Sequence, residues 1–133
     1  MLAGVADTHT VIWYLFAAPY LSQTAKEFLD RAAVTGDQIG ISSITLIEMV
    51  YLIEKGRIAV ESFSRLAAVL QEPNGLFTEI PPDLRVSRAL LRVDSAATPD
   101  MPDRIIAATA LCMGVPLVSK DRKIRLSTLT TIW

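Results

Sequence analysis

Hydrophobic and polar positions follow two kinds of pattern along this chain of 133 residues. Short apolar runs, typical of buried strands, are separated by longer segments in which apolar residues recur every three to four positions, as on one face of a helix. The runs that predict strands are 3–6, 38–42, 76–80, 115–119 and 129–133. The segments that predict helices are 8–17, 22–34, 44–54, 60–70, 81–93 and 100–113. Strands separated by helices indicate a parallel sheet covered on both faces, and 129–133 is expected at its edge.

The segment 99–121 shows this order most clearly. A helix that opens with two aspartates, the second of them Asp103, continues as an apolar run and meets Gly114. Glycine is favoured just beyond the end of a helix because it adopts the left-handed conformation at little cost. The strand 115–119 then places Asp121 just beyond its carboxyl end. Ligands bind at that end of the strands in open parallel sheets, so the segment brings acids towards a potential site.

The composition is that of an ordinary globular protein, with 51% hydrophobic and 20% charged residues. No apolar run reaches the roughly 20 residues that span a bilayer, and residues 1–7 lack the basic start of a signal peptide. Cys112 is the only cysteine, which indicates a reduced structural thiol and excludes a zinc cluster built on cysteines. These features predict a single cytoplasmic domain, 1–133, with no membrane segment.

The net charge of −1 conceals an uneven distribution of charge. Residues 1–83 hold ten acids and five bases, whereas residues 84–133 hold four acids and eight bases. Three of the four late acids fall within 99–121, so the second half is basic except at one focus of acids. This arrangement suits a protein that binds a polyanion through its basic residues and a cation through the focus of acids. A solvated surface with a chance asymmetry explains the charge equally well.

Four acids are predicted to meet at the carboxyl edge of the sheet. Asp7 directly follows the first strand, and Asp121 closely follows the fourth. The helix that carries Asp103 begins at the same edge, and Glu48 lies in the first turns of the helix after the second strand. Because this edge is where such folds bind ligands, the four carboxylates are candidate functional groups.

Each acid also has a purely structural explanation. Asp7 and Asp100 can cap the helices that follow them, and Glu48 can close a capping box with Thr45. Several acids at one edge are harder to explain in this way, because unpaired carboxylates repel and raise each other's pKa values. Glu48 also lies in an apolar run, where a carboxylate needs a cation or a donor. Carboxylate ligation suits Mg²⁺ or Mn²⁺.

Other chemistry finds little support in the sequence. The glycine-rich motifs of dinucleotide and P-loop proteins are absent. His9 is the only histidine, which excludes zinc catalysis by several histidines, and no G-x-S-x-G elbow supports a Ser-His-Asp triad. The aromatic residues Trp13, Tyr14 and Phe16 are expected in the core rather than on a base-stacking surface.

Five motifs together resemble a PIN-domain ribonuclease, and the closest likeness is to VapC-type toxins of toxin–antitoxin modules. The motifs are Asp7-Thr8-His9 followed by Ile12-Trp13, then Ile41-Ser42 with Glu48, Glu54-Lys55-Gly56-Arg57, Asp100-Met101-Pro102-Asp103-Arg104-Ile105-Ile106-Ala107, and Leu117-Val118-Ser119-Lys120-Asp121. The resemblance covers nearly the whole chain. It implies a three-layer α/β/α sandwich with a central, mainly parallel sheet, and Mg²⁺- or Mn²⁺-dependent hydrolysis of RNA phosphodiester bonds.

The resemblance also implies a set of site residues. The catalytic and metal-binding carboxylates would be Asp7, Glu48, Asp103 and Asp121, with Asp100 and Thr8 as further candidate metal ligands. Many relatives of this subtype carry a histidine shortly before the D-x-x-D segment, whereas this chain has Ala97-Thr98-Pro99 there. The basic residues flanking the acids, candidates for holding the RNA backbone with surface ion pairing as the alternative, are Arg104, Lys120 and Arg122.

The implied partners are an RNA substrate, a cognate antitoxin protein and a second copy of the chain in a homodimer. Two apolar helices offer an antitoxin docking surface, and burial within the domain or in a homodimer explains them equally well. The residues concerned are Trp13, Tyr14, Phe16, Tyr20, Leu21, Met49, Tyr51, Leu52 and Ile53. The basic face of Arg85, Arg88 and Arg92 favours a solvated helix surface, with RNA binding as the alternative.

Two alternatives of other classes remain open. A receiver-like signalling module would need a pair of acids after the first strand, where Asp7 is instead followed by Thr8. The second alternative is a non-catalytic scaffold that uses the same fold to bind a partner. A metal-dependent ribonuclease assay with Asp7→Asn as a control distinguishes all three.

Overall fold

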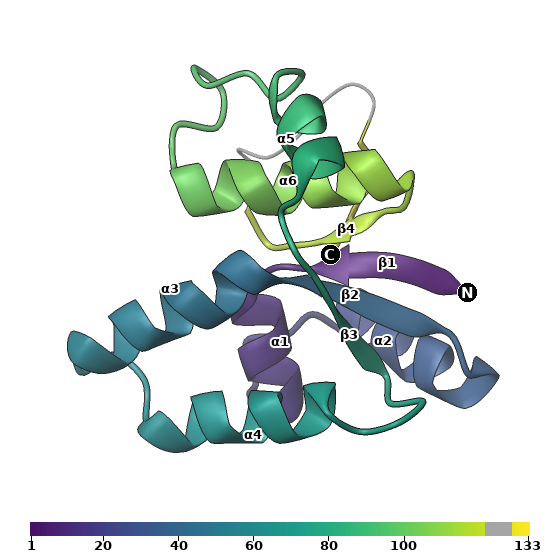
Figure 1. Ribbon diagram of the computed structural model, residues 1–133. Helices are drawn as coiled ribbons and strands as arrows, with labels where there is room; N and C mark the ends of the chain where they lie inside the picture. The colour runs from purple at the N-terminus through teal and green to yellow at the C-terminus, as the bar shows by residue number, and fades with distance from the viewer. Residues whose placement is uncertain (122–128) are drawn as a thin grey trace.

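The computed structural model describes residues 1–121 and 129–133. Figure 1 shows a central sheet with helices packed on both sides, which confirms the three-layer α/β/α arrangement. The elements in chain order are β1 (Leu2–Ala6), α1 (Thr8–Leu15), α2 (Gln23–Thr35), β2 (Gln38–Ser42), α3 (Ser43–Glu54), α4 (Val60–Leu70), β3 (Phe77–Ile80), α5 (Leu84–Leu90), α6 (Met101–Met113), β4 (Leu117–Val118) and β5 (Thr131–Ile132).

The described strands form one sheet in the order β3-β2-β1-β4-β5, and every neighbouring pair is parallel. The first strand of the chain is therefore the central one, and β5 lies at an edge as predicted. All the strands end at the same side of the sheet because all of them are parallel. The segments that follow β1, β2 and β4 are thereby brought together, which is what positions the site.

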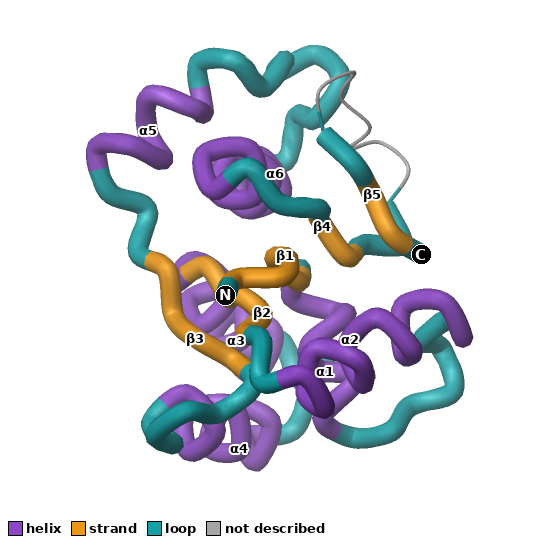
Figure 2. Tube along the Cα trace, turned by 90° about the vertical axis from the view of Figure 1, so that its right-hand side faces the viewer, coloured by secondary structure: helices purple, strands orange, loops and turns teal. Residues whose placement is uncertain are grey.

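Two apolar clusters fill the space between the sheet and its helices. In β1, Val5 and Ala6 are both fully buried but face opposite sides, since successive side chains of a strand alternate. Val5 packs in the cluster that includes α5 and α6, and Ala6 packs in the cluster that includes α1, α2 and α4. Figure 2 shows these two groups of helices on either side of the sheet. The central strand is thus held rigidly from both faces.

Helix ends follow the local signals in most places. Gly114 ends α6 with a φ of 65°, the left-handed conformation expected there. The N-cap of α3 is Ser42, whose hydroxyl accepts from the Ile44 amide, so the helix starts before Thr45. A capping box between Thr45 and Glu48 is therefore wrong, and Glu48 is left without that structural explanation.

The segment 81–93 forms a shorter helix than predicted. Asp83 caps it by accepting from two backbone amides, and α5 ends at Leu90. Arg92 therefore lies beyond the helix. Arg85 and Arg88 are exposed while Val86 and Ala89 are buried, so the predicted division into two faces is confirmed for these residues of α5.

The apolar residues of the expected docking surface separate into two groups. Met49 and Leu52 are buried in the core, so including them in a docking surface was wrong. Phe16 is 42% exposed, which contradicts the expectation that it lies in the core. Tyr51 is 55% exposed and fits a docking surface. In the described part of the chain, no helix is long and apolar enough to cross a membrane.

Candidate active site

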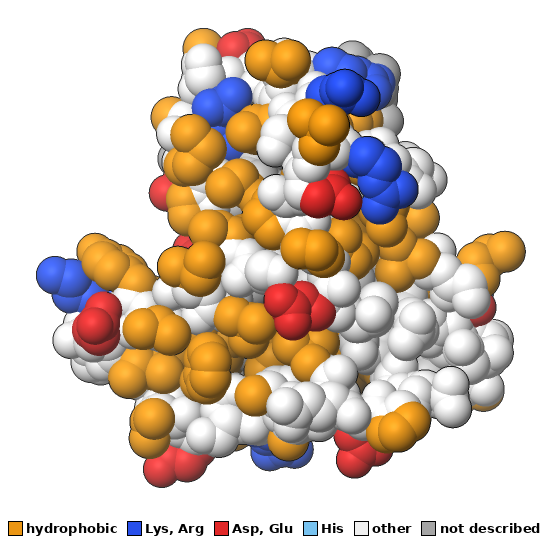
Figure 3. Space-filling model, in the orientation of Figure 1, with side chains coloured by type: hydrophobic (Ala, Val, Ile, Leu, Met, Phe, Trp, Pro, Cys, Tyr) orange, Lys and Arg blue, Asp and Glu red, His pale blue; other side chains and the backbone are white. Residues whose placement is uncertain are grey.

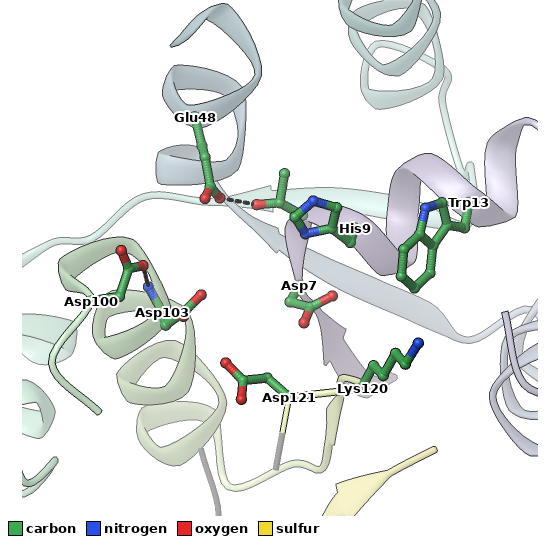
Figure 4. Close-up of a pocket in the computed structure, with 9 residues that line it drawn as sticks. Asp7, His9, Trp13, Glu48, Asp100, Asp103, Lys120 and Asp121 are labelled. Atoms are coloured by element: carbon green, nitrogen blue, oxygen red, sulfur yellow. Dashed lines mark hydrogen bonds between the residues drawn. The ribbon is translucent and has the colours of Figure 1, made fainter. Parts of the chain in front are cut away.

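A cavity of about 440 Å³ opens at the carboxyl edge of the sheet. Figure 4 shows side chains from the residue after β1, from α1 and α3, from the start of α6 and from the segment after β4 arranged around it. The lining residues include all the acids singled out from the sequence, and they are Asp7, Thr8, His9, Trp13, Glu48, Asp100, Asp103, Lys120 and Asp121. The topology thus brings together side chains from distant parts of the sequence.

Asp7 is held by hydrogen bonds on both carboxylate oxygens. Oδ1 accepts from the Thr10 amide at 3.0 Å and caps α1. Oδ2 accepts from the Ser119 hydroxyl at 2.5 Å, and the same hydroxyl accepts from the Asp121 amide at 3.0 Å. The helix-cap explanation of Asp7 is therefore correct for one oxygen. The other oxygen is tied to the segment that follows β4.

Glu48 is reached by a chain of hydroxyl groups. The Thr8 hydroxyl donates to Glu48 Oε1 at 2.5 Å and lies 3.1 Å from the Thr45 hydroxyl. Thr8 has one hydroxyl proton, so when it donates to Glu48 the proton between the two threonines must come from Thr45. Thr8 and Thr45 are both buried. This relay fixes one oxygen of the Glu48 carboxylate beside β1.

Asp100 and Asp103 occupy the start of α6. Asp100 is the N-cap and accepts from the Asp103 amide at 3.1 Å, so its structural explanation is also correct. Asp103 lies in the first helical turn and is half-buried. The pKa of Asp103 is raised to about 7, first by burial and then by the negative charges of neighbouring acids. These neighbours, in order of effect, are Asp100, Asp121, Glu48 and Asp7.

The donor set fits a hard divalent cation. Carboxylate and hydroxyl oxygens are the ligands that Mg²⁺ and Mn²⁺ prefer, and a cation near Asp103 would remove the repulsion that raises its pKa. Within residues 1–121 and 129–133, no three acidic, histidine or cysteine side chains are grouped closely enough to hold an ion as they stand. Mg²⁺ usually keeps several of its waters, which relaxes the need for direct contact with every carboxylate.

The three basic candidates differ in where they lie. Lys120 lines the cavity, and its ammonium is 5.9 Å from the centre of the Trp13 ring. Arg104 instead donates through Nη2 to the Val93 carbonyl at 3.3 Å, which directs its guanidinium towards the segment after α5. Arg122 lies outside the described residues.

Sequence reasoning missed two residues that support the acids. Ser119 holds Asp7, and Thr45 supports Thr8. The available signal for Ser119 was its position, because it is a small polar residue directly after a buried strand and two residues before Asp121. Thr45 gave a misleading signal because its spacing from Glu48 matches a capping box. His9 lines the cavity, as expected for a first-turn residue beside the site. Trp13 also lines it, which its place in an apolar helical segment did not indicate.

The fold and the cavity define a parallel α/β protein with an acid-lined site at the carboxyl edge of its sheet. The family model of the PIN domain matches residues 5–126, and the chain belongs to this family. It is 28% identical over 127 residues to "Ribonuclease VapC22" of Mycobacterium tuberculosis, covering 94% of this chain and 92% of that relative.

Solved structures share the fold at lower sequence identity. VapBC2 from Rickettsia felis, bound to a DNA fragment from its promoter, matches with a TM-score of 0.72 and 19% identity, covering 98% of this chain and 97% of that chain. FitAcB from Neisseria gonorrhoeae matches with a TM-score of 0.63 and 20% identity, covering 96% and 95% respectively. At these identities the likeness concerns the fold alone.

Proposed function

We propose that this chain is a metal-dependent endoribonuclease that hydrolyses RNA phosphodiester bonds and acts as the toxin of a toxin–antitoxin pair. The observation that carries the proposal is the convergence of five carboxylates on one cavity, with the pKa of Asp103 raised to about 7. Membership of the PIN family and the likeness to a named ribonuclease support the same reaction. The proposed unit is the whole chain, 1–133, acting as one domain.

The residues that would hold Mg²⁺ or Mn²⁺ are Asp7, Asp103, Glu48 and Asp121, with Asp100 and Thr8 beside them. Such an ion, when bound, lowers the pKa of a coordinated water and offsets negative charge on the phosphate. Ser119 and Thr10 keep the Asp7 carboxylate in one orientation.

The remaining side chains orient the attack. The relay through Thr8 leaves the second oxygen of Glu48 available to accept a proton from the attacking water. Asp103 can release a proton near neutral pH as positive charge arrives, because its pKa is about 7. Lys120 is the described cation placed to meet a phosphate oxygen at the cavity.

The decisive experiment is a cleavage assay on unstructured RNA with Mg²⁺ or Mn²⁺ added. Wild-type protein should cleave, EDTA should stop cleavage, and Asp7→Asn should lower the rate by at least about a hundredfold, since removing a charged ligand costs several kcal/mol. Asp94→Asn is the matched control, because Asp94 is exposed outside the cavity and its Oδ1, an oxygen that asparagine keeps, accepts from a loop amide. Activity that survives both EDTA and Asp7→Asn would refute the proposal, and a phosphoryl-accepting or purely scaffolding role predicts no cleavage at all.

Two apolar surfaces fit the proposed protein partners. For a second copy of the chain we propose the exposed face of α3, with Ile47 and Tyr51, next to Met101 at the start of α6. Figure 3 shows hydrophobic side chains gathered over this face. For the antitoxin we propose the hollow between α1 and α2 that Tyr14 and Leu21 line. The structural neighbours include toxin–antitoxin complexes, which supports a partner of this kind.

Charge substitutions separate the two surfaces. Tyr51→Glu should turn a dimer into a monomer in light scattering, with antitoxin binding retained. Ala17→Asp, at an exposed residue that lines this hollow, should weaken antitoxin binding and leave the dimer intact. The reverse result would exchange the two assignments. A monomeric wild-type protein would refute the α3 contact.

A further inference from the structure

The cavity has two walls of different chemistry. The carboxylates of α3 and α6 form one wall, and His9, Trp13 and Lys120 lie on the other side of it. In Figure 4, Trp13 and Lys120 lie on one side of Asp7 and the side chain of Asp103 lies on the other. A cation bound by the acids explains the first wall only. Two aromatic rings and an ammonium group in a polar cavity need a separate explanation.

Trp13 is held in place by other rings. Its ring centre lies 5.6 Å from that of His9, 5.5 Å from that of Tyr20 and 5.9 Å from that of Trp133, each at a tilted angle. Such contacts stabilise aromatic pairs beyond simple burial. Trp13 is nevertheless only half-buried and lines the cavity, so part of its ring system is available to a ligand. A rigid, accessible indole is pre-organised for stacking, since little side-chain entropy remains to be lost on binding.

We propose that Trp13 and His9 form a stacking site for an unpaired nucleobase of single-stranded RNA, next to the phosphate that the acids receive. This inference rests on the proposed function and specifies the substrate. Aromatic side chains are the usual partners of unpaired bases, because every base offers a π-face. In a duplex those faces are covered by neighbouring bases, so the site selects single strands.

Lys120 completes this wall. Its ammonium lies 5.9 Å from the Trp13 ring centre, a cation–π contact that occupies the position a base would take. An incoming base displaces the ammonium from the ring, and the flexible lysine side chain then reaches a phosphate of the same strand. Trp13 therefore contributes base contact, and Lys120 contributes charge. The two contributions are separable by experiment.

The competing explanation is that Trp13 only fills space between α1 and the C-terminal residues. Shape and π-character can be separated by substitution. Trp13→Phe keeps an aromatic face, whereas Trp13→Leu keeps an apolar side chain without one. Tyr20→Leu is the matched control, because it removes a ring in contact with Trp13 from a residue that is 64% exposed and lies outside the cavity lining.

Binding is measured by fluorescence anisotropy in the background of Asp103→Asn, which should not cleave. The probes are ten-nucleotide strands of oligo(A) and of abasic residues, which carry the same phosphates. Oligo(A) should bind about 5- to 150-fold more tightly than the abasic strand, the range expected for one stacked base. Trp13→Leu should remove this difference, while Trp13→Phe and Tyr20→Leu keep most of it. Lys120→Gln should weaken the binding of oligo(A) and reduce its salt dependence.

Thermal melting of each variant shows that it is folded under the assay conditions. If folded Trp13→Leu still prefers oligo(A), or if Tyr20→Leu loses the preference equally, the stacking site is wrong while the proposed ribonuclease activity stands. If the background protein binds neither probe and the wild type cleaves no RNA, the proposed function and this inference both fail.

Discussion

The end of β1 and the start of α6 each present an aspartate to the same cavity, in opposite surroundings. Asp7 accepts hydrogen bonds from a backbone amide and from the Ser119 hydroxyl. Within the described residues, the carboxylate of Asp103 has no such donor, and its pKa is raised to about 7 by burial and by the charges of other acids. One carboxylate is already satisfied by the protein, whereas the other is not.

This difference separates two tasks within one site. A carboxylate that is fixed by neutral donors keeps its geometry before any ligand arrives, as a pre-organised site requires. A carboxylate surrounded by like charges destabilises the fold until a cation compensates it. Substitutions at the two places should therefore change stability in opposite directions while both reduce activity. The predictions below test that contrast.

The largest effect is expected from Asp103→Asn. Ribonuclease activity should fall at least about a hundredfold, because a metal-binding charge is lost. The metal-free protein should become more stable by about 1–2 kcal/mol after allowance for solvent screening. Loss of a first-turn charge on α6 costs about 0.3–1 kcal/mol and offsets only part of this gain. Denaturant unfolding in EDTA measures the sign, and a clear destabilisation would contradict the repulsion argument.

Ser119→Ala should have the opposite sign. It removes the donor to Asp7 Oδ2 and the acceptor of the Asp121 amide, in a place that is almost fully buried. Unsatisfied buried groups cost about 1–3 kcal/mol, so the metal-free protein should lose stability. Activity should fall about 10- to 100-fold, as for other residues that orient ligands. Ser119→Thr keeps the hydroxyl and serves as the control; equal losses in both variants would indicate a packing effect.

The sequence could predict the features that depend on local patterns, but not those that depend on contacts between distant segments. The order of strands and helices follows from the hydrophobic period, which is a local signal. The convergence of the acids follows from that order, because the carboxyl ends of parallel strands lie at one edge of the sheet. The role of Ser119 depends on its hydrogen bond to Asp7, which lies in a distant segment of the chain. Spacing along the chain cannot report such contacts.

Trp13 shows a different kind of failure. Its place in an apolar, aromatic helical segment predicts burial, and the ring does pack against Tyr20 and Trp133. The same ring also borders the cavity, because α1 begins directly after the central strand and carries its first turns along the rim. A periodic pattern distinguishes the two faces of a helix, but it cannot show that part of the apolar face borders a cavity.

The pH dependence of stability tests the same comparison between Asp7 and Asp103, with a smaller expected effect. The pKa of Asp103 is raised from 3.8 in the unfolded chain to about 7 in the folded protein. Its contribution to stability is therefore complete below about pH 4 and is lost as the pH rises to about 7. Metal-free wild type should lose about 1–2 kcal/mol more than Asp103→Asn across this window, with solvent screening allowed for. Parallel curves for the two proteins, from denaturant unfolding at several pH values, would show that Asp103 is not the titrating group.

The smallest effect is expected at Thr8, whose hydroxyl links Glu48 to the segment that follows β1. Thr8→Val removes the hydroxyl that donates to Glu48 and faces Thr45, while nearly preserving the volume of the side chain. Stability should fall by about 1–3 kcal/mol because the hydrogen bonds to Glu48 and to Thr45 are both lost. Cleavage should slow about tenfold, since Glu48 is positioned less well but retains its charge. Thr8→Ser restores the hydroxyl and should recover most of the activity. If Thr8→Val cleaves at the wild-type rate, the hydroxyl relay supports the fold only and does not position Glu48.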